Sequence, residues 1–226
     1  MRTPIDSNKY RQAIGKLMYL MLCTRPDLAF SVSLLSRFIS FPKEKHWRCI
    51  LQLLKYIKTT KELSLVYSSL GDIKLIGYTD SDHGGNLDDR KSTSGFIFSI
   101  SGCCISWKSS KQKTVAISST EAEYVGLSTC VQEALWLRSL LKELGHNQKQ
   151  TIIFGDNLSS MQIIKGGVSN RSKHIDVRHH FLRDHISNKE IDVQYQKSQD
   201  LCADFLTTAV NHSKHYQCMK FINLTS

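Results

Sequence analysis

The residues best suited to chemistry are carboxylates that end apolar segments of the chain. Asp80 lies near the end of residues 73–82, whose side chains alternate between two faces as in a β-strand, and it shares the apolar face with Tyr78. Asp156 ends residues 151–156 in the same way. A carboxylate on an apolar face loses its hydration, which is costly without a partner. Both acids therefore indicate a cation at the ends of two strands.

Two further acids lie on predicted helices. Glu123 lies near the start of the longest predicted helix, residues 119–144, and heads an apolar stripe that would pack on a sheet. The stripe comprises Leu127, Cys130, Val131, Ala134, Leu137 and Leu141. Glu121 heads a mostly polar face and fits a capping box, so we interpret it as a cap or a solvated acid. Asp204 lies on a final short helix that Ser198 can cap.

Four convergent acids, Asp80, Glu123, Asp156 and Asp204, would suit hard divalent cations. Mg²⁺ prefers anionic oxygen ligands and keeps several waters. Two such ions about 4 Å apart can clamp an in-line displacement at phosphorus, one activating water and the other stabilising the leaving oxygen. Alternatively the acids are ordinary salt-bridge partners, since the chain holds 20 Asp and Glu residues. Three of the four lie on apolar faces at element ends, which favours the metal site.

The first part of the chain is predicted to be helical. Apolar residues at helical spacing indicate helices over residues 10–22 and 44–58, and another that Pro26 begins. No acid cluster accompanies them. We interpret this unit as structural packing.

From residue 73 the pattern changes to that of an α/β domain. Its further elements are a hairpin of residues 94–100 and 103–108, helices over 157–165 and 172–187, and a strand over 190–196. Residues 211–226 are expected to form a ragged tail. These elements predict a mixed sheet flanked by helices, preceded by a small all-helical unit.

The composition favours an intracellular protein with polyanionic partners. The formal net charge is +10 and the pI about 9.3, which favours binding to phosphates. The seven cysteines show no Cys-x-x-Cys pair, so we expect reduced thiols. No signal peptide is recognisable, and the apolar residues 17–23 are too few to span a bilayer. We therefore expect a cytoplasmic location without membrane contact.

Several basic and hydroxyl side chains are candidate nucleic-acid contacts. They are Arg90, Lys91, Ser92, Lys108, Lys111, Lys113 and Lys173. Basic side chains bind the phosphate backbone without reading sequence, and hydroxyls suit the 2′-hydroxyls of an A-form-like hybrid. Taken individually, each of these residue types in a loop is more often ordinary loop structure than a nucleic-acid contact.

A zinc site is an alternative for the histidine-rich stretch near residue 176. Its candidate ligands would be His174, Asp176, His179 and His180. His179 and His180 lie on different helix faces and no cysteine joins them, whereas structural zinc requires a closed set of nitrogen and sulfur ligands. A solvated basic face is the favoured interpretation.

A series of motifs follows a fixed order along the second part of the chain. They are Tyr78-Thr-Asp-Ser-Asp82, Arg90-Lys-Ser-Thr-Ser-Gly95, Ile105-Ser-Trp-Lys108, Ser118-Ser-Thr-Glu-Ala-Glu-Tyr124, Asp156-Asn157, Lys173-His-Ile-Asp-Val-Arg178 and Ala203-Asp-Phe-Leu-Thr207. Together they resemble the ribonuclease H domain of copia-type LTR retrotransposon Pol polyproteins. The helical unit is similar to the preceding segment there, the end of the reverse transcriptase, through Tyr10-Arg-Gln-Ala-Ile-Gly15, Met18-Tyr-Leu20, Thr24-Arg-Pro-Asp27 and Leu34-Leu-Ser-Arg-Phe38.

The resemblance implies a ribonuclease H-like fold and a metal-dependent endonuclease that hydrolyses the RNA strand of RNA–DNA hybrids. The four acids match the family's metal-binding residues, with two Mg²⁺ ions and Mn²⁺ as a substitute. It divides the chain into a connection-like helical segment (1–65), a ribonuclease H-like domain (72–210) and a tail (211–226). The implied partners are the hybrid and the rest of a reverse transcriptase.

An alternative is a truncated retroelement remnant that binds nucleic acid without turnover. The family commonly continues Leu-Thr-Lys-Pro where this chain has Leu206-Thr-Thr-Ala209, and no histidine lies between His185 and His212 to aid turnover, unless Lys197 takes that role. The polymerase palm, with its paired aspartates, would lie upstream. We therefore expect no DNA synthesis from this chain.

Overall fold

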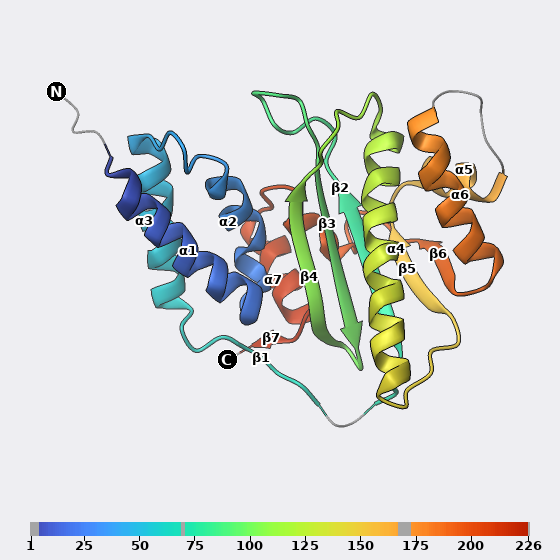
Figure 1. Cartoon of the computed structure of the whole chain (residues 1–226). Coiled ribbons are helices and arrows are strands. Elements are labelled where there is room, and N and C mark those ends of the chain that lie inside the picture. The colour runs from blue at the N-terminus through green and yellow to red at the C-terminus, as the bar shows by residue number, and fades with distance from the viewer. Residues whose placement is uncertain (1–4, 69–70, 167–172, 226) are drawn as a thin grey trace.

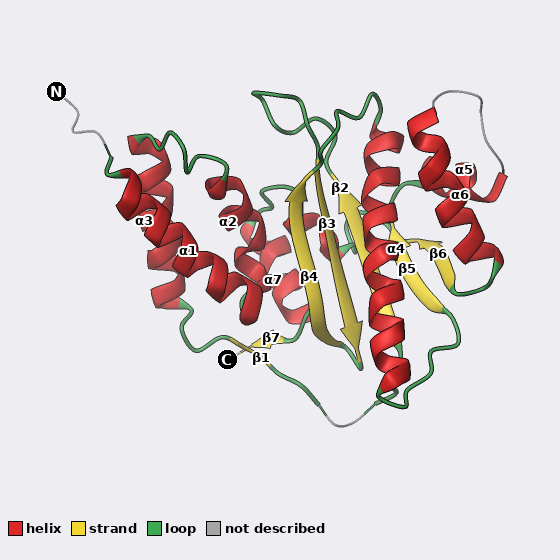
Figure 2. Cartoon of the chain, in the orientation of Figure 1, coloured by secondary structure: helices red, strands yellow, loops and turns green. Residues whose placement is uncertain are grey.

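The computed structural model describes residues 5–68, 71–166 and 173–225 (Figure 1). Within these residues, five strands form a mixed sheet in the order β4-β3-β2-β5-β6, and helices flank it (Figure 2). The strands are β2 (Leu75–Ser81), β3 (Thr93–Ile100), β4 (Cys103–Lys111), β5 (Thr151–Gly155) and β6 (Ile191–Tyr195). The predicted mixed sheet flanked by helices is confirmed.

The register of the central strands decides where the two strand-end acids lie. β2 is antiparallel to β3 but parallel to β5, with Tyr78 opposite Phe154, and β5 is parallel to β6. Parallel strands end at the same edge of a sheet. Asp80 and Asp156 each lie two residues beyond that matched pair, so they meet at one edge.

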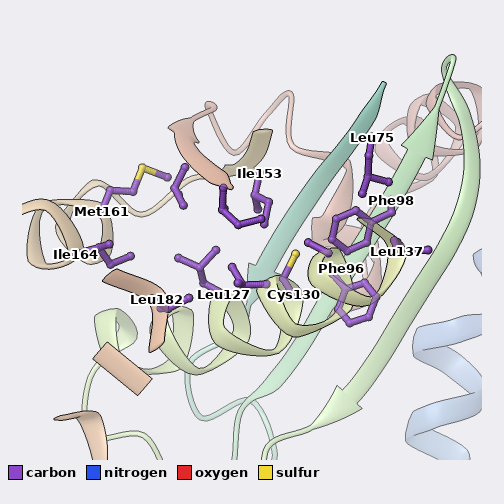
Figure 3. Close-up of a cluster of buried hydrophobic side chains, with 14 of the residues drawn as sticks. Leu75, Phe96, Phe98, Leu127, Cys130, Leu137, Ile153, Met161, Ile164 and Leu182 are labelled. Carbon is purple, nitrogen blue, oxygen red and sulfur yellow. The ribbon is translucent and has the colours of Figure 1, made fainter. Parts of the chain in front are cut away.

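One face of the sheet is covered by a long helix, α4 (Ser119–Glu143), together with α5 (Leu158–Gly166) and α6 (Lys173–Ser187). Figure 3 shows the core between them, in which Leu127 and Cys130 of α4 meet side chains such as Ile153. Every residue of the predicted α4 stripe belongs to this core. Complete burial of one such leucine contributes about 1.5–3 kcal/mol, which fixes the rotation of α4 on the sheet.

The other face is covered by the turn η2 (Cys202–Leu206) and by α7 (His212–Phe221). After α7 the chain forms β7 (Leu224–Thr225), which pairs with β1 (Ser64–Leu65). The expectation of a ragged tail over residues 211–226 is therefore wrong. The tail has too few apolar residues to be recognised alone, but Cys218 and Ile222 enter a core with Tyr78 and Leu206.

The helical unit consists of α1 (Ser7–Cys23), the turn η1 (Pro26–Leu28), α2 (Ala29–Ser36) and α3 (Glu44–Thr59), with its own core. Pro26 begins the short turn η1 rather than α2 itself. The unit packs against the sheet, since α2 contacts β4 and the Trp107 Nε1 donates to the Met21 carbonyl at 3.0 Å. Figure 1 shows α7 between this unit and the sheet.

The remaining structural expectations concern thiols and membranes. All seven cysteines lie in the described residues and are free thiols, as predicted. In the part of the chain that the structure describes, no helix is both long and apolar enough to cross a membrane.

Candidate active site

Asp80 is one of the two buried acids among the four predicted ones. It lies near the end of β2, on the face covered by η2, with 8% of its surface exposed. The Thr207 hydroxyl, just after η2, donates to its Oδ2. Burial raises the pKa of Asp80 to about 7, while Thr207 lowers it and Asp156 and Asp204 raise it. A cation bound beside Asp80 would therefore stabilise its ionised form.

Asp156 directly follows β5 at the same edge of the sheet. It is half-buried, and the Ser198 hydroxyl donates to its Oδ2 at 2.6 Å. Ser198 therefore does not cap the turn that carries Asp204, because that turn begins at Cys202 without a side-chain cap. The predicted capping role of Ser198 is wrong, and the residue orients Asp156 instead.

Glu123 reaches the same edge from the first turns of α4. It is 8% exposed, and its Oε1 accepts from the backbone N–H of Ser81 at 3.3 Å. Burial, together with the charges of Asp80 and Asp156, raises the pKa of Glu123 to about 9. Glu121 instead accepts from the Ile117 N–H, while its own N–H donates to Ser118. Its interpretation as a cap is confirmed.

Three of the predicted acids converge on one point. One carboxylate oxygen from each of Asp80, Glu123 and Asp156 lies within 4.8 Å of the other two. No lysine or arginine among the described residues forms an ion pair with any of them. Like charges this close raise one another's pKa values and favour a bound cation.

Asp204 lies beside this cluster rather than inside it. It is half-buried on η2, where Thr208 donates to its Oδ1 at 3.1 Å. Its charge still reaches Asp80, whose pKa it raises. The structure therefore brings three acids together and leaves the fourth on the rim.

The donor set fits a hard divalent cation. All the converging atoms are carboxylate oxygens, which are the ligands that Mg²⁺ and Mn²⁺ prefer over the nitrogen and sulfur ligands of zinc. Asp80 and Glu123 are buried without a cationic side chain, so a bound ion would offset a charge that the chain itself leaves uncompensated.

The predicted nucleic-acid residues differ in what they offer to a ligand. Arg90, Lys108 and Lys113 are exposed, whereas Lys111 pairs with Asp89 at 2.7 Å. Lys91 is half-buried in the same loop as Arg90. These side chains surround the loop and hairpin that follow β2.

Ser92 does not offer a surface to a ligand. It is fully buried, and its hydroxyl accepts from the Gly84 N–H at 3.0 Å. The expectation that Ser92 contacts nucleic acid is therefore wrong, and the residue stabilises the loop. Its type and position in a polar loop gave no sign of its burial.

Part of the histidine-rich stretch cannot be compared with expectation. The side chains of Lys173, His174, Asp176 and His179 lie outside the described residues. His180 is exposed. Among the described residues, the group of side chains that could hold a metal ion consists of Asp80, Glu123 and Asp156, and it contains no histidine.

Two contributors to the site were missed by sequence reasoning. Thr207 and Ser198 each donate to an acid that lies far away in the chain, by 127 and 42 positions. Both are hydroxyl residues in short polar stretches, and nothing in their local pattern distinguishes them from ordinary turn residues. The order of the strands alone brings them to the acids.

A mixed sheet in this order, with carboxylates at the shared edge of β2 and β5 and a third on α4, defines a ribonuclease H-like protein. No family model matches the chain. It is 38% identical over 218 residues to the retrovirus-related Pol polyprotein from transposon TNT 1-94 of Nicotiana tabacum, covering 96% of this chain and 16% of that protein. The chain belongs to the family of copia-type retrotransposon Pol polyproteins.

The chain is also similar to proteins of other descriptions. The chain is 48% identical over 128 residues to the secreted RxLR effector protein 161 of Plasmopara viticola, covering 57% of this chain and 90% of that one. Among solved structures, RNase H1 from Halobacterium salinarum matches 59% of this chain and 94% of its own, at 12% identity and a TM-score of 0.46.

One solved structure covers both parts of the chain. The foamy viral protease-reverse transcriptase in complex with dsDNA matches 88% of this chain and 40% of its own, at 10% identity and a TM-score of 0.59. At that identity the match concerns the fold alone. It extends over both the helical unit and the sheet, which supports their arrangement as one body.

Proposed function

We propose that this chain is a metal-dependent endonuclease that hydrolyses the RNA strand of RNA–DNA hybrids. The observation that carries the proposal is the cluster of Asp80, Glu123 and Asp156, whose carboxylate oxygens lie within 4.8 Å of one another at the edge of a ribonuclease H-like sheet. The chain spans 16% of the length of the tobacco polyprotein, so its activity within a longer protein is part of the proposal.

The three clustered acids would hold the metal, with Asp204 completing the set from the rim. Bound divalent ions would supply an activated water and stabilise charge on the leaving oxygen. Thr207 and Ser198 restrict the carboxylates of Asp80 and Asp156 by donating to them. Glu123 is held by the Ser81 N–H, which ties α4 to the end of β2.

Exposed basic side chains near this edge suit the phosphate backbone of the hybrid. Arg90, Lys108 and Lys113 are exposed. Lys91 lies beside Arg90 in the loop between β2 and β3, and Lys111 at the end of β4 pairs with Asp89 of that loop. A hybrid is recognised by its shape and its 2′-hydroxyls more than by its base sequence. We include Lys173 from the start of α6 and the rest of a reverse transcriptase as further contributors to binding.

The test is cleavage of a labelled RNA–DNA hybrid by the purified chain in Mg²⁺. We expect cleavage of the hybrid but not of single-stranded RNA or an RNA duplex, leaving a 3′-hydroxyl and a 5′-phosphate. Asp156→Asn should abolish cleavage and leave hybrid binding within a few fold, since it removes one ligand charge. Asp200→Asn, an exposed aspartate outside the cluster, is the matched control and should retain full activity.

The other outcomes assign the chain differently. Hybrid binding without cleavage in Mg²⁺ or Mn²⁺ would contradict the nuclease proposal and favour a remnant that only binds nucleic acid. Equal cleavage by the Asp156→Asn variant would show that the activity comes from a contaminant or from another site.

A further inference from the structure

An arginine of the helical unit reaches the metal-site end of the sheet. Arg37 follows α2, and its Nη2 donates to the Thr93 hydroxyl at 3.1 Å. Thr93 begins β3, 56 positions further along the chain. The contact therefore joins the helical unit, which we expected to serve only as packing, to the strand beside β2.

Thr93 and Asp82 close the loop that follows β2. The Asp82 N–H donates to the Thr93 carbonyl at 3.0 Å, and the Thr93 N–H donates to the Asp82 Oδ1 at 2.5 Å. The Thr93 hydroxyl bonds the same carboxylate while it accepts from Arg37. We call this group of bonds the Asp82–Thr93 clasp. It lies immediately after Ser81, whose N–H holds Glu123.

Arg37 is placed to stabilise the clasp by charge as well as by its hydrogen bond. Its guanidinium is half-buried and is attracted by the carboxylates of Asp82 and Asp89. Its Nε is buried with no hydrogen-bond partner among the described residues. A buried guanidinium is costly unless it is paired, so its place here depends on these carboxylates.

The charge on Asp82 also concerns the site itself. Asp82 lies two residues beyond Asp80, and its carboxylate adds to the negative charge that acts on Glu123. The positive charge of Arg37 offsets part of the Asp82 charge, and the Thr93 N–H holds the Asp82 Oδ1. Without Arg37, the charge of a further acid beside the metal site would not be offset.

We infer that Arg37 is a positioning residue for the metal site, through which the helical unit holds the Asp82–Thr93 clasp and thereby the end of β2 that carries Asp80. The functional consequence for metal use rests on the proposed nuclease activity. The structural consequence for the loop of residues 83–92 does not, and it can be measured without any cleavage of nucleic acid.

The first measurement is limited trypsin digestion of the full chain, followed by mass spectrometry. Arg90 is exposed, and Lys91 is half-buried in the loop that the clasp closes, so cleavage after either residue reports opening of the loop. Without Arg37 the loop should open more often. We therefore expect cleavage after Arg90 or Lys91 to increase about tenfold in Arg37→Ala, measured relative to cleavage after the exposed Lys61. Arg37→Lys should restore much of the protection because it keeps the charge.

The matched control is Arg48→Ala. Arg48 is also in the helical unit, but its side chain is 73% exposed and, among the residues that the structure describes, forms an ion pair only with Glu44. We expect its digestion pattern to equal that of the wild type. Thr93→Val removes the hydroxyl while keeping the shape. Combined with Arg37→Ala, it should increase loop cleavage by less than the product of the two single effects, because both changes remove the contact between Arg37 and Thr93.

The second measurement is the Mg²⁺ dependence of hybrid cleavage. We expect Arg37→Ala to raise the Mg²⁺ midpoint about fivefold or more while KM for the hybrid changes less than about twofold, since the change disturbs ligands rather than substrate contacts. A residue that only contacted substrate would change KM instead.

The inference is overturned if Arg37→Ala matches Arg48→Ala in both loop cleavage and Mg²⁺ midpoint. It is also overturned if Arg37→Ala increases cleavage equally at sites throughout the chain, which would mean general unfolding. If no variant, including the wild type, cleaves the hybrid, the proposed function fails while the digestion still decides whether Arg37 holds the loop.

Discussion

At the scale of single residues, the site concentrates negative charge where water is scarce. Asp80 and Glu123 are each 8% exposed, and burial is the main reason that their pKa values rise to about 7 and about 9. Unfolded carboxyl groups titrate near pH ~4. The metal-free fold therefore holds protons that the unfolded chain would release at neutral pH.

This difference predicts how the stability of the metal-free protein depends on pH. Because the folded state binds more protons between about pH 5 and pH 9, its free energy of unfolding should fall as the pH rises through that range. Glu123→Gln removes one such group, so in EDTA it should gain on the order of a few kcal/mol over the wild type between pH 5 and pH 8. Urea unfolding at both pH values measures the gain.

Two controls accompany this measurement. Glu121→Gln should show no such gain, because Glu121 is a cap at the start of α4. Mg²⁺ should stabilise the wild type more at pH 8 than at pH 5, because a ligand that binds the ionised site stabilises the folded state by mass action. A wild type and a Glu123→Gln variant that differ equally at both pH values would contradict the assigned protonation.

Sequence reasoning reached the acids but not the groups that hold them. Asp80 and Asp156 were predictable because alternation placed a charge on an apolar face, and Glu123 because helical spacing distinguished it from Glu121. The roles of Thr207 and Ser198 were not predictable, because a hydroxyl residue in a polar turn shows no periodicity that indicates its hydrogen-bond partner. The separation of Asp204 from the cluster depends on the path of η2, which local pattern does not reveal.

At the scale of elements, the position of Glu123 depends on how closely α4 approaches the sheet. Gly126 lies one turn after Glu123, and a Cβ there would overlap the Ser81 Oγ and lie 3.1 Å from the Ser94 Oγ. Gln112 reinforces this approach, because its Nε2 donates both to Ser94 at 2.7 Å and to the Ala122 carbonyl at 2.8 Å. The start of α4 is thus clamped against β2 and β3.

A pair of variants tests this clamp. Gly126→Ala should push α4 away from β2, lower the free energy of unfolding by about 1–3 kcal/mol and reduce hybrid cleavage, because Glu123 moves with the helix. Adding Ser81→Ala removes the overlapping hydroxyl but keeps the N–H that Glu123 accepts from, so activity should recover. Failure of the double variant to recover, with the single variant inactive, would locate the fault outside this contact.

At the scale of the whole molecule, α7 joins the two parts of the chain. Cys218 of α7 and Ile222, directly after it, lie in the core that covers this face of the sheet, while Met219 of α7 contacts the Tyr56 hydroxyl of α3 at 3.4 Å. Tyr56 in turn donates to Asp27, which pairs with Arg25 at 2.7 Å. The helical unit and the sheet are therefore expected to unfold together.

Replacing the residue that follows α7 tests this coupling. Ile222 is 1% exposed, so Ile222→Ala should cost about 2–4 kcal/mol and raise hydrogen exchange equally in α3 and in β2. Tyr216→Ala, at a position 50% exposed on α7 itself, should change stability much less. Faster exchange in β2 with α3 unchanged would show that the two parts unfold independently.

The sequence predicted the helical unit and the α/β part, but not how they combine. Most helices and strands begin and end within a few positions of expectation, because their periodicity is strong. Residues 212–221 mix polar and apolar side chains without a clear apolar stripe, so we infer that packing against the rest of the protein stabilises their helix. The division of the chain into residues 1–65, 72–210 and 211–226 stays a prediction. The contacts that residues 212–221 share with both other parts argue against treating them as separate units.

The pairing of β7 with β1 has a consequence for how the protein is made. β1 follows the helical unit directly, and its partner residues, 224 and 225, are among the last that the structure describes. During translation the helical unit and the five strands leave the ribosome well before α7 and β7, and early parts of a chain begin to fold first. The nascent chain would thus expose the apolar surface around Tyr78 and Leu206 until synthesis has passed residue 225. Chaperone binding during that interval is expected to centre on this surface.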